Sequence, residues 1–260
     1  MQLHIGLIIN PLAGLGGSRA LKGSDGEMVR DLARSLDDSE LHRASDRAAR
    51  ALALVSACED VRVSTWGGAM GQDVCLHLRL PAHVLGRPDA GLTGPEHTRE
   101  AARAMLDAGV DLLVFAGGDG TARDIYDVIG LQLPVLGIPA GVKMHSGVFA
   151  VSPEAAGELL LELVRGGLVG LRRQEVRDID EEAFRRDVVR SRYYGEMQVP
   201  GEGRYLQHTK VGGRESQELV AAEIAVWVTE NLESGVTYLV GPGSTTAAIM
   251  EELGLANTLL

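Results

Sequence analysis

The chain has 260 residues, with 25 basic and 36 acidic side chains and a formal net charge of −11. This acidic balance argues against nucleic acid as the main partner, because proteins that bind phosphate backbones usually carry a basic stripe. A hydrophobic fraction of 45 % excludes a mostly disordered chain, and no apolar run reaches the roughly 18 residues of a membrane span. Since the two cysteines show no metal-ligand spacing and the first residues lack the basic segment of a signal peptide, we expect a cytoplasmic protein without a membrane partner.

Short apolar runs alternate with helical stretches over the first part of the chain, which is typical of βαβ units in a parallel sheet. We expect strands at residues 3–9, 61–65, 112–116 and 135–138, and helices at residues 43–58, 96–108 and 122–129. Ser152 should cap a further helix that has Pro153 at its first position. The expected fold class is therefore α/β, with a doubly wound parallel-sheet domain over residues 1–168.

Residues 169–260 are expected to form a second, smaller domain with a β-rich part. The pattern predicts strands at residues 188–198 and 236–240 and helices at residues 216–232 and 245–253. The chain stops at Leu260, where another strand is expected to begin. We therefore expect this second domain to be truncated at its C-terminal end.

A loop that contains glycine follows each of these strong strands, and 33 glycines are an excess for this length. The first loop carries Asn10 and Gly14, and the late loop carries Gly243, Ser244 and Thr245. In an open parallel sheet such loops meet at the carboxyl ends of the strands, where ligands bind. Because glycine lets backbone N–H groups approach a phosphate closely, the loops predict a phosphate-binding site.

The sharpest loop is Gly117-Gly118-Asp119-Gly120-Thr121, between a buried strand and a helix. Its three glycines leave little side-chain bulk, so Asp119 is expected to stand alone at the sheet edge. A carboxylate would repel bound phosphates unless it had a task, such as accepting a proton from an attacking hydroxyl or holding Mg²⁺. The alternative is that Asp119 only caps the following helix.

The loop after residue 138 brings three further candidates, Lys143, His145 and Ser146. Lys143 could place a point charge on a phosphate, and the alternative is a surface lysine in a turn. His145 could donate to a phosphate or a base edge, and the alternative is a structural hydrogen bond to backbone. Arg123 and Asp124 follow the Asp119 loop, and we expect them to form either part of the site or a local surface ion pair.

These strings carry a resemblance to a known family. The run of residues 117–121 resembles the GGDGT signature of the ATP-NAD kinase and diacylglycerol kinase superfamily, and Asn10-Pro11-Leu12-Ala13-Gly14 resembles its first-strand loop. The strings at residues 115–124 and 136–146 resemble the ATP-NAD kinase-like branch that includes acetoin-catabolism-associated proteins. Residues 241–245 are similar to the Gly-Ser-Thr loop in the second domain of NAD kinases.

This resemblance implies a phosphotransferase that uses Mg²⁺ and ATP, or polyphosphate, to phosphorylate a hydroxyl of NAD or a related nucleotide, as in NADP biosynthesis. It implies that Asp119 is the base or the orienting group and a candidate Mg²⁺ contact, with Gly117, Gly118, Gly120 and Thr121 around the phosphates. The chain lacks the Asn-Glu or Asn-Asp pair that holds the nucleotide in NAD kinases, and it has Pro139 where they usually carry asparagine. A homo-oligomer is compatible with these features.

Two other functions stay open at this point. The missing asparagine pair favours a nucleotide-binding regulator that has lost catalysis. Gly241 and Gly243 after a predicted strand would suit an NAD(P)-dependent dehydrogenase, although no full GxGxxG occurs there. A P-loop NTPase is excluded because the chain contains no GxxxxGK[ST] string.

Overall fold

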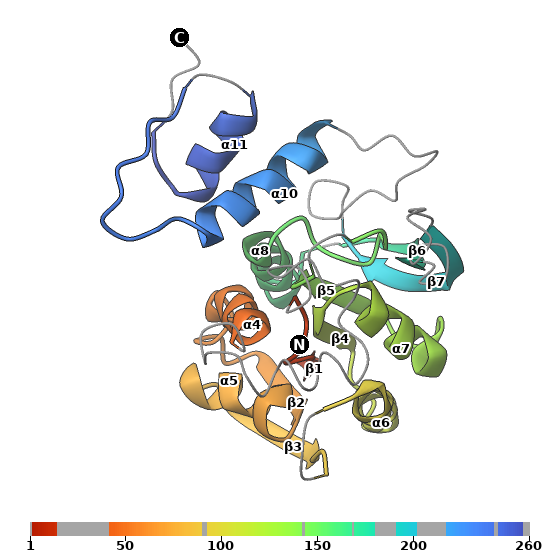
Figure 1. The fold of residues 1–260 in the computed structure, drawn as a ribbon. Coiled ribbons are helices and arrows are strands. Elements are labelled where there is room, and N and C mark those ends of the chain that lie inside the picture. Colours follow the sequence, from red (N-terminus) through yellow and green to blue (C-terminus); the bar gives the residue numbers. More distant parts are fainter. Residues whose placement is uncertain are drawn as a thin grey trace. The chain divides into compact units, whose positions relative to one another are not determined.

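A five-stranded parallel sheet with the order β3-β2-β1-β4-β5 organises the first part of the protein, as Figure 1 shows. The strands are β1 (Leu3–Ile9), β2 (Val61–Trp66), β3 (Ala82–Gly86), β4 (Leu112–Gly117) and β5 (Val135–Pro139). This computed structural model describes residues 2–14, 42–89, 93–141, 144–167, 169–179, 191–201, 217–241 and 244–256. The described chain divides into two units, residues 1–209 and 210–260.

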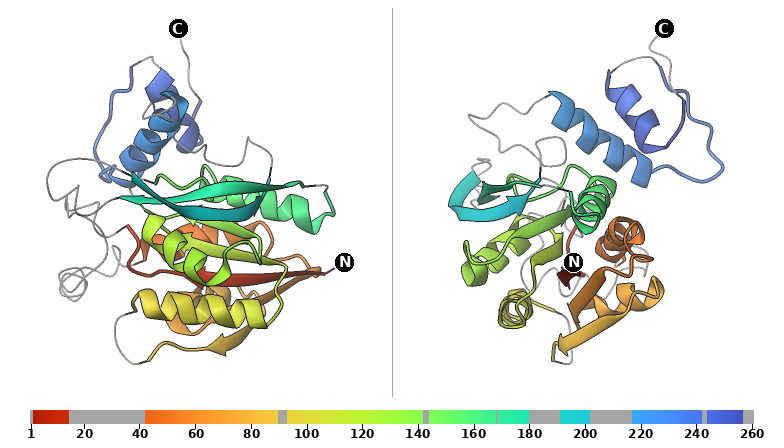
Figure 2. Two further views of the ribbon diagram at one scale, coloured as in Figure 1. Left: turned by 90° about the vertical axis from the view of Figure 1, so that its right-hand side faces the viewer. Right: turned by 180° about the vertical axis from the view of Figure 1, so that it is seen from behind.

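Helices cover both faces of the sheet, so the predicted doubly wound α/β fold is confirmed. The first unit contains α4 (Arg43–Ala53), the 3₁₀ turn η1 (Gly68–Met70), α5 (Gln72–His77), α6 (Pro95–Asp107), α7 (Asp119–Ile129) and α8 (Pro153–Val164). Helices α4 and α8 pack against each other, and α6 packs against α7 (Figures 1 and 2). At the start of α8, the Ser152 hydroxyl accepts a hydrogen bond from the Ala155 N–H at 3.1 Å, as the sequence predicts.

The hydrophobic core lies between the sheet and its helices. Burial in this core explains why the apolar segments of β1 and β4 form strands. Residues 5–9 and 112–116 are buried throughout, so the central strands β1 and β4 need apolar side chains on both faces. The rings of Phe115 and Phe149 meet edge to face with centroids 5.3 Å apart. Gly137 of β5 makes this possible, because a Cβ there would lie 2.4 Å from the Phe149 ring.

Some element boundaries differ from the sequence expectation. Helix α4 ends at Ala53 instead of residue 58, because the N–H groups of Val55 and Cys58 bond to carbonyls three residues back and the chain tightens into turns. Strand β3 and helix α5 were not predicted from the sequence. Both have only five or six residues, which is too short for a clear hydrophobic period.

A two-stranded antiparallel sheet of β6 (Leu171–Ile179) and β7 (Ser191–Pro200) follows α8 and belongs to the first unit. It packs against α7 and β5, as Figures 1 and 2 show. The Tyr126 ring of α7 fits against β7 at Gly195, where a Cβ would lie 2.2 Å from the ring. The predicted domain boundary after residue 168 stays a prediction.

The second unit contains two helices that pack together, α10 (Gln217–Glu230) and α11 (Ser244–Glu252). The strand predicted at residues 236–240 is wrong, because this segment is irregular and Leu239 is 97 % exposed. A strand must pair its backbone N–H and C=O groups with a neighbour, and no strand of the described residues runs beside it. Among the described helices, none combines the length and the apolar character needed to cross a membrane.

Candidate active site

The strand order of the sheet reverses between β1 and β4, and the loops after these two strands are bonded together. The Asn10 N–H donates to the Ala116 carbonyl at 2.9 Å. The Asn10 side-chain amide donates to the Thr121 hydroxyl at 2.9 Å, while its oxygen accepts from the Leu12 N–H at 3.1 Å. In doubly wound folds ligands bind at this reversal, so the sequence candidates Asn10 and Thr121 lie at the expected edge.

Close approach explains the glycines of these loops. A Cβ on Gly117 would lie 2.5 Å from the buried Thr121 side chain, and a Cβ on Gly141 would lie 3.1 Å from the Gly118 Cα. Gly14 has a φ of +87°, and a Cβ there would lie 2.5 Å from the Ala140 carbonyl oxygen. The loops after β1, β4 and β5 therefore converge, and side chains would keep them apart.

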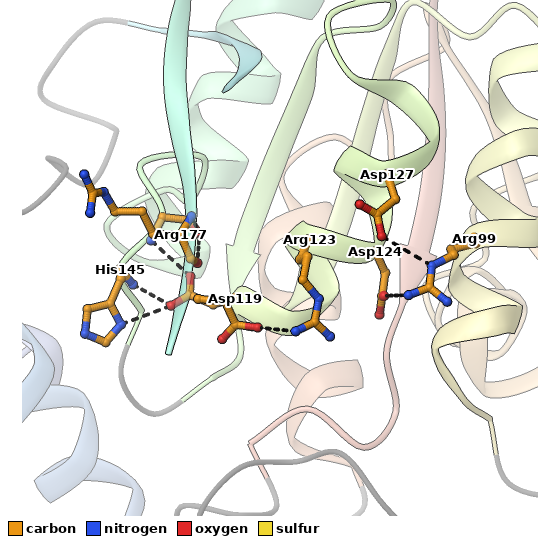
Figure 3. A network of polar contacts seen from close by, with 9 residues as sticks. Arg99, Asp119, Arg123, Asp124, Asp127, His145 and Arg177 are labelled. Carbon is orange, nitrogen blue, oxygen red and sulfur yellow. Dashed lines mark hydrogen bonds and ion pairs between the residues drawn. The ribbon is translucent and has the colours of Figure 1, made fainter. Parts of the chain in front are cut away.

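Asp119 is the first residue of α7, and its side chain is only 5 % exposed. One carboxylate oxygen accepts from the His145 N–H at 2.6 Å, and the other accepts from the Ser146 N–H at 3.0 Å (Figure 3). The expectation that Asp119 stands alone at the sheet edge is wrong, because the loop after the neighbouring strand β5 encloses it. The carboxylate also makes no hydrogen bond to the backbone of its own helix, so the capping alternative does not describe its contacts.

His145 and Ser146 complete this cluster from the β5–α8 loop. The His145 Nδ1 atom lies 3.2 Å from the Asp119 oxygen that its backbone N–H contacts, and the His145 side chain is 13 % exposed. The buried Ser146 hydroxyl donates to the Arg177 carbonyl at 2.7 Å and accepts from the Arg177 N–H at 3.0 Å. The Gly147 N–H donates to the carbonyl of Glu175, so strand β6 fixes the loop that holds Asp119.

Arg123 and Asp124 each contact a charged residue of a neighbouring element. Arg123 donates to Asp178 of β6 at 2.8 Å, and Asp124 accepts from Arg99 of α6 at 2.5 Å (Figure 3). Consecutive residues of a helix point in different directions, so their side chains meet different neighbours. These two ion pairs attach α7 to β6 and to α6, and they stabilise the helix that carries Asp119.

Three sequence candidates, Gly243, Ser244 and Thr245, belong to the second unit. Lys143 and Gly243 lie outside the described residues. Ser244 is the first residue of α11, and Thr245 follows it within that helix. The structure thus brings together Asn10, Thr121, Asp119, His145 and Ser146 in the first unit, while the proposed roles of the other residues stay predictions.

Sequence reasoning missed two contributors to the site. Arg47 is buried in α4, and its guanidinium donates to the Pro139 carbonyl at 2.7 Å beneath the β5 loop. Its place on the apolar stripe with Ala44, Ala48 and Ala51 was the available signal, since an arginine on a buried face needs a partner. The bond between Ser146 and Arg177 had no local signal, because the two residues are 31 positions apart.

Residues able to hold a cation are few in this part of the chain. Across the described segments, no group of three or more His, Cys, Asp or Glu side chains could hold a metal ion. A carboxylate has about four lone-pair positions, and the two backbone N–H groups occupy only part of them at Asp119. Mg²⁺ is usually bound by one or two carboxylates together with substrate phosphates, and a contact between Asp119 and Mg²⁺ stays a prediction.

The family match of this chain lies within the first unit. The family model described as the ATP-NAD kinase N-terminal domain matches residues 5–168. Acetoin catabolism protein X of Cupriavidus necator is 28 % identical over an alignment of 155 positions, which covers 54 % of this chain and 38 % of that protein. The chain therefore spans about two fifths of the length of this curated relative.

A comparison with solved structures gave one further match. It comes from Bacillus anthracis, where the protein is provisionally assigned as a diacylglycerol kinase. The similarity has a TM-score of 0.35 and a sequence identity of 15 %, and it covers 68 % of this chain and 43 % of the other.

Proposed function

The chain belongs to the ATP-NAD kinase family, and on that premise we propose that it transfers a phosphoryl group from ATP, or polyphosphate, to a hydroxyl of NAD or a related nucleotide. The family supports a kinase-like phosphotransferase in general. The observation that carries the proposal is the fixed carboxylate of Asp119, between converging glycine loops at the strand-order reversal.

Phosphate binding in this proposal relies on backbone groups more than on cations. The first N–H groups of a helix have no partner within the helix, and the helix dipole favours negative charge there. At the start of α7 these groups belong to a stretch with three glycines, so a phosphate can approach the backbone closely. This suits a chain with a net charge of −11, whose surface does not attract anions in general.

Asp119 is proposed to orient the acceptor hydroxyl or to take part in removing its proton. Phosphoryl transfer depends mainly on positioning and charge stabilisation, so a carboxylate fixed by two backbone donors suits this role. When bound, Mg²⁺ would neutralise phosphate charge, with Asp119 as its protein contact. The two N–H donors and the burial of the side chain hold the carboxylate in one orientation before a substrate binds.

The test incubates the protein with ATP and Mg²⁺, or with polyphosphate, against a panel of nucleotides and small alcohols, and identifies new phosphorylated masses. We expect a phosphorylated nucleotide from the wild-type chain and at least a roughly 100-fold lower rate from Asp119→Asn, with nucleotide binding largely kept in calorimetry. Asp127→Asn is the matched control, because this acid lies on the same helix and its side chain is 47 % exposed. Equal rates for Asp119→Asn and wild type would contradict the role of Asp119, and tight binding without product would favour a regulator.

A further inference from the structure

The face of helix α7 that begins with Asp119 rests on the small sheet of β6 and β7. Asp119, Arg123 and Tyr126 are spaced four and three residues apart, so their side chains share one face of the helix. The Arg123 guanidinium donates to the Asp178 carboxylate of β6 at 2.8 Å (Figure 3). The Tyr126 ring packs against Gly195 of β7, where a Cβ would lie 2.2 Å from it. The small sheet therefore supports α7 along the side that carries the carboxylate.

Strand β6 also holds the loop that supplies the two backbone donors of Asp119. The His145 and Ser146 N–H groups donate to the Asp119 carboxylate at 2.6 and 3.0 Å. The Ser146 hydroxyl is bonded to the carbonyl and the N–H of Arg177, the residue before Asp178 in β6. Neighbouring residues of one strand thus bond to the loop that contacts Asp119 and to the helix that carries it. Because both partners are attached to β6, this strand sets the position of the carboxylate relative to its donors.

A β-bulge in β7 adds a second contact to Arg123. The register of the two strands shifts between Val176 and Arg177, so that Tyr194 is the extra residue of β7 at this point. Bulges are frequent beside active sites, where the extra residue redirects a side chain. The Arg123 guanidinium carbon lies 5.8 Å from the centre of the Tyr194 ring, which is within the range of a cation–π contact. Arg123 is thus held by a carboxylate from β6 and by an aromatic ring from β7.

The ion pair of Arg123 and Asp178 is shielded from water. These side chains are 21 % and 17 % exposed, whereas those of Arg50 and Glu154, which pair at 2.7 Å between α4 and α8, are 43 % and 48 % exposed. Ion pairs at exposed positions contribute little, because water and salt screen them. We therefore expect the loss of Asp178 to disturb its helix more than the loss of an exposed partner such as Glu154.

We propose that Arg123, Asp178 and Tyr194 are positioning residues, which hold α7 on the small sheet so that Asp119 keeps its orientation during phosphoryl transfer. This inference rests on the phosphotransferase function proposed above, and it gives the small antiparallel sheet a role in the reaction. The three side chains act through Asp119 and are not catalytic residues. Phosphoryl transfer depends largely on positioning, and a displacement of about 1 Å can lower a rate by about 100-fold.

The first experiment compares kcat and KM of Asp178→Ala and of wild type in the full chain, at a temperature where circular dichroism shows both to be folded. We expect kcat to fall by about 10- to 100-fold. KM for the nucleotide should change by less than about threefold, because a lost orientation of Asp119 acts on the transition state and leaves ground-state binding in place. Asp178→Glu keeps the charge and should recover part of the lost rate. Glu154→Gln is the matched control and should keep the wild-type kcat. An unchanged kcat in Asp178→Ala, or an equal loss in the control, would overturn the inference.

Variants of Tyr194 test the ring separately from the ion pair. Tyr194→Leu removes the aromatic face from Arg123 and should lower kcat several-fold, with KM again nearly unchanged. Tyr194→Phe keeps the ring and should recover most of the rate that the leucine variant loses. Equal rates of the two variants would overturn the role of Tyr194. This comparison also decides the question if Asp178→Ala does not fold.

Amide hydrogen exchange tests the positioning without any substrate. We expect the His145 and Ser146 amides to exchange faster in Asp178→Ala than in wild type, because their hydrogen bonds to Asp119 open more often. In Glu154→Gln they should exchange at the wild-type rate, and unchanged exchange in Asp178→Ala would overturn the inference. Absence of any phosphorylated product from the wild-type chain would instead overturn the proposed function and, with it, the role of these residues in transfer. Product at the wild-type rate from Asp178→Ala overturns only the present inference.

Discussion

Replacement of Ser146 by alanine tests whether strand β6 holds the loop that contacts Asp119. The Ser146 hydroxyl is bonded to both the carbonyl and the N–H of Arg177, at 2.7 and 3.0 Å. Glu175 and Arg177 lie two residues apart on β6, so their backbone groups face the same edge of the strand. Ser146 and Gly147 form hydrogen bonds with that edge. The alanine variant removes the two bonds of the Ser146 hydroxyl and leaves the bond of the Gly147 N–H in place.

The magnitude follows from what the substitution leaves without a partner. Ser146 is 1 % exposed, and each buried polar group that loses its hydrogen bond costs about 1–3 kcal/mol. Because the two bonds are partly buried, we expect a loss of about 2 kcal/mol in the free energy of unfolding of the first unit. For a unit of this size such a loss corresponds to a Tm lower by roughly 4–8 °C.

The assay is urea unfolding followed by circular dichroism, together with amide hydrogen exchange of Arg177. Ser56→Ala is the matched control, since this hydroxyl also donates to a backbone carbonyl, at 2.9 Å, but at an exposed contact. We expect the control to change the free energy of unfolding by less than about 0.5 kcal/mol. If Ser146→Ala behaves like the control, and the Arg177 amide exchanges at the wild-type rate, the reasoning about the loop and β6 is refuted.

Two further predictions concern a loop glycine and a strand histidine. Gly117→Ala places a Cβ 2.5 Å from the side chain packed on it and should cost about 1–3 kcal/mol of stability and weaken nucleotide binding in calorimetry, whereas Gly170→Ala, with open space around it, should be nearly neutral. Burial, followed by the charge of Arg62, lowers the pKa of His4 below its usual 6.5, so the folded state disfavours the charged form. The stability from His4 is therefore present above about pH 6.5 and is lost as the pH falls through the lowered pKa. Urea midpoints at several pH values should show this loss in wild type and a smaller one in His4→Gln, and equal losses in both would contradict the assignment.

The sequence predicted strands β1, β2, β4 and β5 of the sheet, because the signals of these strands are local. Residues 5–9 and 112–116 carry no polar side chain on either face, which is the pattern of central parallel strands, and both stretches lie in strands. The GGDGT string and its neighbours led to the family that the comparison then matched over residues 5–168. The strand expected at residues 236–240 failed because a strand depends on a pairing partner, and the apolar run itself says nothing about one.

At the site, the sequence and the tertiary structure also determine different features. The sequence by itself determined that Asp119 follows a buried strand within a run of glycines, and that the loop with His145 and Ser146 follows another strand. Only the tertiary structure decided that the two strands are neighbours, so that backbone donors 26 and 27 residues away enclose the carboxylate and an imidazole lies against it. The reason is physical: short-range periodicity sets which segments become strands and helices, but strand order sets which loops meet, and the chemistry of Asp119 depends on the loop it meets.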